Sequence, residues 1–425
     1  MSNHFPASAN MDTKQFIGWI MFNLLMVPIM YIRPEKMKNV VLWMNVVSAI
    51  TLLCMMIWCL SAAHGAGPLV SQPATVSDSG LGWGIVSGIT TIIGGIAVGL
   101  TNQADYSRFA RRPGDQVMGQ WISIIGFGAI MPVFGCLASS ATQAIYGEAI
   151  WSVASHVTFS DNTQVLIADR NPPNLIQKWL DTDYNAKSRA AAFFAGCGLV
   201  VCQLAINIID NAFSTGMDMA GLFPSYINIR RGAYVGLILS IATCPWQLLS
   251  SAATFISVLS AYSVFLGPMV GIMVCDYWVL RGRRIKLTDL YHPHEEGLYH
   301  YWHGINWRSF VSWIVGWAYL IPGFAHAVTP GVVAPDACTG LYYLAFPLGF
   351  AVSFLTHWAV NAVCPPQGLG VVDEVDYYCT FTSDEAMRLG VAPNQALEAE
   401  AVEADTGSFG NDVEKSKKEP EVTKV

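Results

Sequence analysis

The sequence contains little charge for its length. Asp, Glu, Lys and Arg make up 12% of its 425 residues, whereas soluble proteins use roughly a quarter of their residues in this way. A large part of this charge also lies in the last stretch of the chain, after residue 372. Too little remains to cover a water-facing surface of this size, and lipid is therefore the expected solvent for most of the chain.

The sequence also lacks metal-binding spacings and a basic cluster. None of its ten cysteines stands in a CxxC or Cys/His zinc pattern, and most lie in apolar runs, where cysteine packs as a small apolar residue. The net charge of −7 argues against nucleic acid as a partner, because nucleic acid requires a clustered basic face. No signal peptide precedes the first apolar run, and a multispanning protein can use its first span for targeting.

Long apolar runs dominate what is present. A helix needs about 20 mostly apolar residues to cross a bilayer. Runs without Asp, Glu, Lys or Arg predict nine such helices, with the longest run divided near Pro245. The predicted spans lie near residues 15–32, 40–62, 81–104, 116–146, 190–214, 232–246, 252–278, 309–327 and 341–363. The expected fold class is an all-α polytopic membrane protein.

The loops between these spans alternate in charge. Every second loop carries Lys or Arg, as at 33–38, 108–112, 230–231 and 281–286, whereas the loops at 63–80 and 328–340 carry neither. Because cytosolic loops collect Lys and Arg, this pattern predicts an extracellular stub at 1–14 and a transmembrane domain at 15–365. Residues 366–425 then form a cytosolic tail, disordered after about residue 395 because it is polar and charged. An external start without a signal suggests that spans are missing from the front.

One predicted span carries a polar stripe. Its members are Gln203, Asn207, Asp210 and Asn211. Their spacing of i, i+4, i+7 and i+8 places all four on one helical face. Charged and amide groups at membrane depth are costly and usually face a cavity or a partner. The alternative is a set of interhelical hydrogen bonds, which return only about 0.6 kcal/mol each on average. We expect a polar site for a neutral, planar solute, because amides offer both donors and acceptors.

Two further features bear on such a site. A carboxylate that loses water can accept and release a proton near neutrality, so Asp210 is a candidate coupling residue; it could instead lie at the wet end of its span or pair with a base elsewhere. Gly94 and Gly95 are adjacent near the centre of the span 81–104, and each lowers helix propensity by about 1 kcal/mol. Since transporters bind solutes at interrupted helices, we expect the helix to unwind there; close packing of helices is the alternative.

Several short motifs are distinctive. Asn102-Gln-Ala-Asp105-Tyr-Ser-Arg108-Phe-Ala fits the pattern N-x-x-D-[YF]-S-R-[FY]-A, and a second motif ends in Cys-Asp276-Tyr-Trp. With the stretch from Gln203 to Gly232, these motifs resemble the nucleobase:cation symporter-1 family, in particular its fungal uracil, uridine and allantoin permeases. The resemblance covers residues 1–365, and Asn102, Asp105, Arg108 and Asp276 are then structural motif residues.

This resemblance implies a fold and a site. Family members have twelve spans in a LeuT-type inverted-repeat bundle, so the nine spans here correspond to spans four to twelve, and the chain is expected to be N-terminally truncated. The family's base-binding Asn matches Asn211, with Asn207 and Gln203 as support. Backbone contacts from the family's broken sixth span match Gly95 and Ile96, beside Gly94.

The resemblance also implies the coupling ion. The hydroxyl ligands of sodium-coupled members would fall at Ala205 and Ile206, which offer no side-chain oxygen. Sodium is therefore not expected, and a proton is the expected coupling ion, with no cofactor and no metal. The histidines of the 279–308 loop (His292, His294, His300 and His303) are interpreted as part of an interfacial aromatic belt, with a metal site as the alternative.

Together these features predict a multi-pass permease of a fungal plasma membrane, with a nucleobase-like solute and the lipid bilayer as its partners. No nucleophile–base pair lies at membrane depth, so an enzyme is not expected. A non-transporting nutrient sensor with the same fold is the alternative. Because spans one and three contribute to binding and coupling in the family, we expect this chain to be inactive in transport unless about three upstream spans are added.

Overall fold

The computed structural model describes residues 3–5, 11–72, 78–110, 114–150, 172–245, 263–290, 296–329, 331–377, 381 and 383–393. Regular structure in these residues is almost entirely helical, with one short parallel pair, β1 (Val375–Asp376) and β2 (Ala392–Pro393). This confirms the all-α class.

The first half contains α1 (Thr13–Met30), α2 (Lys38–Ala62), α3 (Asp78–Thr101), α4 (Gln103–Ser107), α5 (Val117–Trp121), η4 (Ile122–Phe127), α6 (Gly128–Tyr146) and α7 (Pro172–Thr182). The second half contains α8 (Ala186–Ile206), η6 (Asn207–Phe213), α9 (Ser214–Leu222), α10 (Ile229–Ala242), α13 (Ser263–Val274), η7 (Cys275–Leu280), α14 (Leu287–Leu290), α15 (Trp307–Ala318), α16 (Ile321–Val328), α17 (Asp336–Tyr343), α18 (Ala345–Val363) and α19 (Ser383–Leu389).

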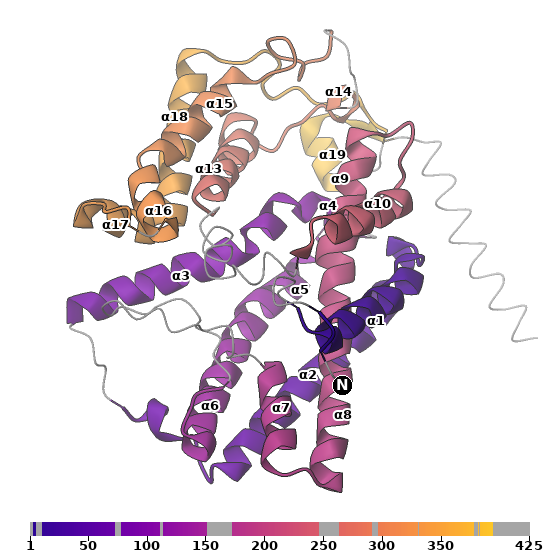
Figure 1. Ribbon diagram of the computed structural model, residues 1–425. Coiled ribbons are helices and arrows are strands. Elements are labelled where there is room, and N and C mark those ends of the chain that lie inside the picture. Colours follow the sequence, from indigo (N-terminus) through magenta and orange to yellow (C-terminus); the bar gives the residue numbers. More distant parts are fainter. Residues whose placement is uncertain are drawn as a thin grey trace, which may run out of the picture. The chain divides into compact units, whose positions relative to one another are not determined.

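The chain forms two compact units. The first comprises Met1–Phe109, Gln116–Gly267 and Trp317–Gly349, and the second comprises Ala110–Asp115, Pro268–Gly316 and Phe350–Val425. Helices α13, α15 and α18 each pass from one unit into the other. Figure 1 shows the elements in sequence colours.

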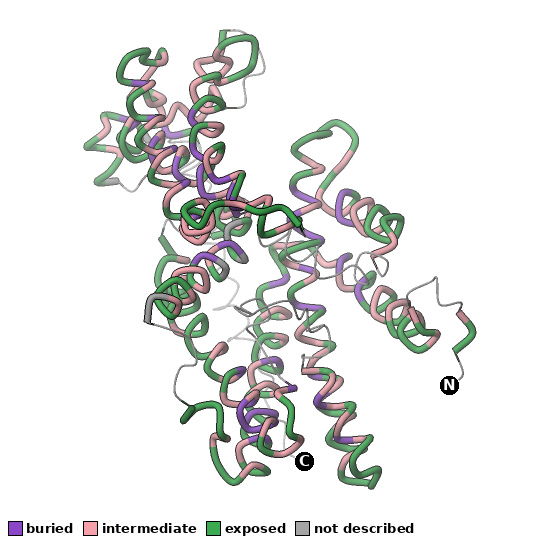
Figure 2. Tube along the Cα trace, turned by 60° about the vertical axis from the view of Figure 1, so that its left-hand side comes forward, coloured by how far each residue is buried: buried purple, intermediate pink, exposed green. Residues whose placement is uncertain are grey.

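Six helices in the described part of the chain are long and apolar enough to cross a bilayer, or seven if the interrupted pair α15 and α16 counts as one span. Only 11% to 33% of the residues in their most apolar stretches are buried, and Figure 2 shows buried residues as short patches along otherwise exposed helices. Apolar side chains without protein neighbours require lipid around them, because each would otherwise expose its surface to water. The total of nine spans stays a prediction.

The helices differ in places from the predicted spans. The span predicted at 190–214 is part of a longer continuous helix, α8–η6–α9, which covers Ala186–Leu222. The span predicted at 309–327 is interrupted at Tyr319 and Leu320, and α16 begins at Ile321 with Pro322 in its first turn, where proline is favoured because its missing N–H would have no partner within the helix. Much of the predicted 252–278 span and the residues after 393 lie outside the described residues.

Close contacts between helices in the first unit depend on small side chains. Helix α2 packs against both α6 and α8, and its Met55 and Cys59 are buried there. A Cβ atom on Gly198 of α8 would collide with the side chain of Thr51 of α2. Small residues let helix backbones approach closely within a bilayer, and the α2–α8 contact follows this rule.

Helices α9 and α10 meet at a pair of glycines. A Cβ atom on Gly216 would collide with the backbone oxygen of Ile229, and one on Gly232 would lie 2.8 Å from the backbone oxygen of Gly216. Both obstacles are backbone atoms, which cannot rotate away, so the contact can form only with glycine at these positions.

We expect Gly216→Ala to destabilise the α9–α10 contact by about 1–3 kcal/mol, as for other overpacked interiors. The measurement is the thermal unfolding midpoint of the purified chain in detergent. Gly221→Ala is the matched control, because Gly221 lies on the same helix and a Cβ atom added to it would meet nothing within 4 Å in the described structure. Equal midpoints for the two variants would show that the close approach at Gly216 is unimportant.

Candidate functional site

The polar stripe lies on the continuous helix α8–η6–α9. Gln203 and Asn211 are exposed and Asn207 is half-buried. The side-chain nitrogen Nδ2 of Asn207 donates to the backbone oxygen of Gln203 at 2.9 Å, and that of Asn211 donates to Oδ1 of Asn207 at 3.0 Å. The three residues therefore form a ladder along one face, and none of the described helices covers it completely. Their role in binding remains a prediction.

The middle of this helix is a π-helix. Residues Asn207–Phe213 form η6, whose hydrogen bonds run from i to i+5. Single π-turns inside α-helices occur frequently at functional sites. Opposite the stripe, Ile208, Ala212 and Phe213 are buried in a core that includes Met26 and Met30 of α1. This apolar face fixes the helix, and the amide face stays accessible.

Asp210 and Ile96 lie at a common hollow of about 350 Å³, within the range of roughly 300–1,000 Å³ typical of small-molecule pockets. The hollow is lined by Ile96, Gly99, Leu100, Gln103, Tyr106, Gln120, Ile124, Ile209 and Asp210. The structure thus brings together two residues predicted for different roles. The lining does not include Gln203, Asn207 or Asn211, which lie on the same helix outside this hollow.

Gln103 and Gln120 were missed from the sequence as members of this hollow. Gln103 follows an apolar helix, and Gln120 lies near the beginning of another. An amide at a helix end is usually solvated, so the sequence carried no signal that distinguished these two residues from ordinary solvated amides. In the structure they add amide donors and acceptors beside the carboxylate of Asp210.

The predicted break at Gly94 and Gly95 is wrong. Helix α3 runs without interruption from Asp78 to Thr101, and the chain turns only at Asn102. An unwound backbone in lipid would leave several N–H and C=O groups without partners, and this cost exceeds the roughly 1 kcal/mol lost per glycine. A Cβ atom on Gly88 or Gly99 would meet no described atom within 4 Å, so close packing does not explain these two glycines either.

The motif that begins at Asn102 contacts the π-helix region. Asn102 donates from Nδ2 to Oγ of Ser214 at 3.0 Å, and the hydroxyl of Tyr106 donates to the backbone oxygen of Ile209 at 3.1 Å. Arg108 lies over the ring of Phe109, 5.8 Å from its centroid. Asn102 and Tyr106 therefore position η6, whereas Asp105 is half-buried beside them. Tyr106 also lines a second, mainly apolar hollow of about 400 Å³ that contains Lys38 and Asn45.

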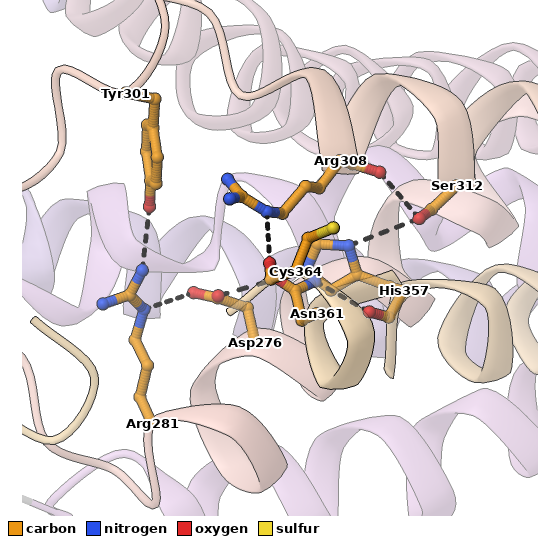
Figure 3. A network of polar contacts seen from close by, with 8 residues as sticks. All are labelled: Asp276, Arg281, Tyr301, Arg308, Ser312, His357, Asn361 and Cys364. Carbon is orange, nitrogen blue, oxygen red and sulfur yellow. Dashed lines mark hydrogen bonds and ion pairs between the residues drawn. The ribbon is translucent and has the colours of Figure 1, made fainter. Parts of the chain in front are cut away.

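The other motif residue, Asp276, belongs to a polar network in the second unit (Figure 3). Its Oδ2 accepts from Nε of Arg281 at 2.7 Å, and Nη2 of Arg281 donates to the hydroxyl of Tyr301 at 2.8 Å. Arg281 is only 4% exposed. Burial lowers the pKa of Arg281, but the hydrogen bond to Asp276 and the negative charge of Asp276 outweigh this effect, and the pKa is raised. For the Tyr301 hydroxyl, burial raises the pKa, and the hydroxyl therefore stays neutral.

The loop after Arg281 is held by further bonds in the same unit. The Arg281 guanidinium lies 4.9 Å from the centroid of the Tyr299 ring, and the Tyr299 hydroxyl accepts from the backbone N–H of Lys286 at 2.9 Å. Asp373 accepts from the backbone N–H groups of Leu287 and Thr288. These bonds hold the described residues of this loop within the second unit.

Metal ligands do not gather anywhere in the described part of the chain, where no group of three His, Cys, Asp or Glu side chains could hold an ion. His292 and His294 lie outside the described residues. His303 has its ring against Trp302, with centroids 5.3 Å apart. The described residues therefore offer no support for the alternative of a metal site in this loop.

Comparison with known proteins identifies the family. Residues 2–349 match the family described as "Permease for cytosine/purines, uracil, thiamine, allantoin". The chain belongs to this permease family. Its members are membrane transporters and not enzymes. The resemblance seen in the sequence motifs is thus confirmed.

Two curated fungal relatives show the extent of the similarity. Transporter aclS of Aspergillus oryzae is 46% identical over 427 residues, which cover 92% of this chain and 66% of the relative. Thiamine transporter THI72 of Saccharomyces cerevisiae is 31% identical over 407 residues, which cover 96% of this chain and 64% of the relative. The chain therefore spans slightly less than two thirds of the length of these relatives.

The fold agrees with a solved structure of the same family. Mhp1, a nucleobase-cation-symport-1 family transporter in a closed conformation with bromovinylhydantoin bound, matches with a TM-score of 0.53 and 20% identity, over 88% of this chain and 71% of Mhp1. The fold of the permease is thus the LeuT-type bundle expected from the motifs.

We expect Tyr106→Phe to destabilise the permease by about 1 kcal/mol, because the Ile209 carbonyl loses a hydrogen-bond donor while the ring remains. The thermal unfolding midpoint in detergent measures this effect. Tyr226→Phe is the matched control, because Tyr226 is 79% exposed. A midpoint for Tyr106→Phe equal to that of the control would mean that this hydroxyl does not hold η6.

Proposed function

We propose that this permease carries a small, neutral, planar solute of the nucleobase type across the plasma membrane, and that Asn211 binds the solute with support from Asn207 and Gln203. The observation that carries the proposal is the exposed amide ladder on a helix whose other face is buried. Amide groups exposed along a membrane helix are costly unless a cavity or a partner receives them.

The chemistry of an amide ladder suits a nucleobase-like solute. Each amide offers two N–H donors and a carbonyl acceptor, and one N–H of Asn211 is engaged by Asn207. The remaining groups can pair with the alternating donors and acceptors at the edge of a heterocycle such as uracil or allantoin. Ile96, at the nearby hollow, gives an apolar surface for the flat face of such a ring.

The hollow beside Asp210 supports a proton as the coupling ion. Asp210 lies there with Gln103 and Gln120, which can hydrogen-bond either protonation state of a carboxyl. Ala205 is buried and, like Ile206, has no side-chain oxygen, which argues against sodium. Proton binding to Asp210 and solute binding on the same helix would then be linked through η6.

The loop charges support a cytosolic C-terminus. The basic loops begin at Arg33, Arg108, Arg230 and Arg281, and cytosolic loops collect such residues. This orientation places the loop after Arg281 in the cytosol. The fungal source of both relatives supports a fungal protein, for which the plasma membrane is the proposed location.

The experiment is uptake of radiolabelled uracil, uridine, allantoin and thiamine by yeast that lacks its own carriers for them. Cells would express this chain in one arm and a form extended by upstream spans in another. We expect Asn211→Ala to lower uptake of the transported solute at least about tenfold, because a buried hydrogen bond to the solute is worth more than 1 kcal/mol.

Asn23→Ala is the matched control, because the Asn23 amide also bonds its own helix, at the backbone oxygen of Trp19, but lies on α1, which contacts η6 through its buried apolar face. Binding to the purified protein would be measured in parallel. Unchanged uptake in Asn211→Ala would refute the assignment of the base-binding residue. Binding of a solute without uptake in either form would refute transport.

A further inference from the structure

His357 has an unusual position in the second unit (Figure 3). It lies on α18 and its side chain is completely buried. Nδ1 lies 3.4 Å from Oγ of Ser312 on α15, and Nε2 lies 4.0 Å from Oδ1 of Asp276 on η7. Nε2 has no hydrogen-bond partner among the residues that the structure describes. A buried ring nitrogen without a partner is costly, so this arrangement needs an explanation.

The hydrogen-bond network assigns the tautomer of His357. Ser312 donates its only hydroxyl proton to the backbone oxygen of Arg308 at 2.7 Å. Its Oγ can therefore only accept from His357, so Nδ1 carries the ring proton. Whenever the ring is neutral, Nε2 is then an acceptor that faces the carboxylate of Asp276, with Nε2 and Oδ1 4.0 Å apart.

Arg281 disfavours a proton on Nε2 while it is bound to Asp276. Its guanidinium already neutralises Asp276 through the 2.7 Å bond to Oδ2, so the pair has no net charge. A proton added to Nε2 would leave one uncompensated positive charge among buried groups, and such charges are strongly disfavoured. The carboxylate of Asp276 can thus be neutralised by Arg281 or by protonated His357. Two cations beside one carboxylate would leave a net positive charge, which is unfavourable.

We propose that Nε2 of His357 and Oδ1 of Asp276 form a proton-binding site whose occupancy alternates with the engagement of Arg281. When Arg281 is bound to Asp276, the site is empty. When Arg281 leaves, a proton from water binds Nε2, and the imidazolium becomes the counter-ion of Asp276. Because the two equilibria are linked, proton binding must favour release of Arg281 as strongly as release favours proton binding.

Among the described residues, the other groups that surround His357 carry no competing negative charge. On α15, Arg308 donates from Nε to the backbone oxygen of Cys364 at 2.7 Å. On α18 itself, Asn361 donates to the backbone oxygen of His357 at 2.7 Å. On the loop, Tyr301 and Tyr299 contact Arg281 through its Nη2 and its flat face. Asp276 is therefore the acidic group that faces the imidazole from these elements.

Release of Arg281 would free the start of the loop that follows it. Arg281 follows the end of η7, and through Tyr301 and Tyr299 it connects that helix end to the loop. Proton binding at His357 would therefore loosen the loop from the end of the α13–η7 helix. This site is independent of the solute site on α8–η6 and does not rest on the proposed function.

The test is a titration of the purified full chain in detergent by NMR of isotopically labelled histidine. The sequence contains nine histidines, and His357→Gln identifies the signal of His357. In Arg281→Gln we expect the proton affinity of His357 to rise about tenfold or more relative to the unmodified chain, because an adjacent positive charge is lost. The additional change Asp276→Asn should abolish this rise.

Arg308→Gln is the matched control, because it removes a nearby guanidinium that does not contact Asp276; its effect should stay below about threefold. Tyr301→Phe keeps every charge but loosens Arg281, and should raise the proton affinity in the same direction by a smaller factor. This variant also serves if Arg281→Gln fails to fold. An unchanged affinity in Tyr301→Phe and Arg281→Gln, or an equal rise in Arg308→Gln, would overturn the proposal.

Discussion

Within a bilayer no water is available to satisfy a polar group, and this constraint governs the structure of the chain. The backbone responds by forming helices, in which every interior N–H and C=O finds a partner within the same segment. Polar side chains have only two solutions, a partner inside the protein or a wet cavity. In the described residues, the cluster around Asp276 has protein partners, whereas the amide stripe on α8–η6 is exposed.

The clusters differ in how completely they are paired. Asp276 and Arg281 form an ion pair in which Arg281 is buried and Asp276 is half-buried, and removing one partner of such a pair leaves a charge that is not compensated. The amides of Asn207 and Asn211 bond to each other along an exposed face and keep further donors and acceptors for another molecule. A matched pair fixes structure, whereas an incompletely paired stripe suits the temporary binding of a solute.

Much of this arrangement followed from the sequence, because apolar runs and the 3.6-residue period act locally. The polar stripe from Gln203 to Asn211 and the helix that bears it were predicted in this way. The π-helices were not, because one extra residue per turn hardly changes a short periodic pattern. The unwinding expected at Gly94 and Gly95 was wrong, because lipid enforces helix despite low propensity. The partners of Asp276 were also not predicted, because His357 and Tyr301 are distant in sequence.

The central claim is that the amide face of η6 is open to water within the membrane. Its most direct test is the reaction of Asn207→Cys and Asn211→Cys with a charged, membrane-impermeant thiol reagent, applied to each side of the membrane, with Ile208→Cys on the buried face as the reference. The account predicts rapid labelling at both amide positions, slowed by a transported solute, and little at residue 208. Labelling of residues 207 and 211 by lipid-soluble reagents alone would contradict it.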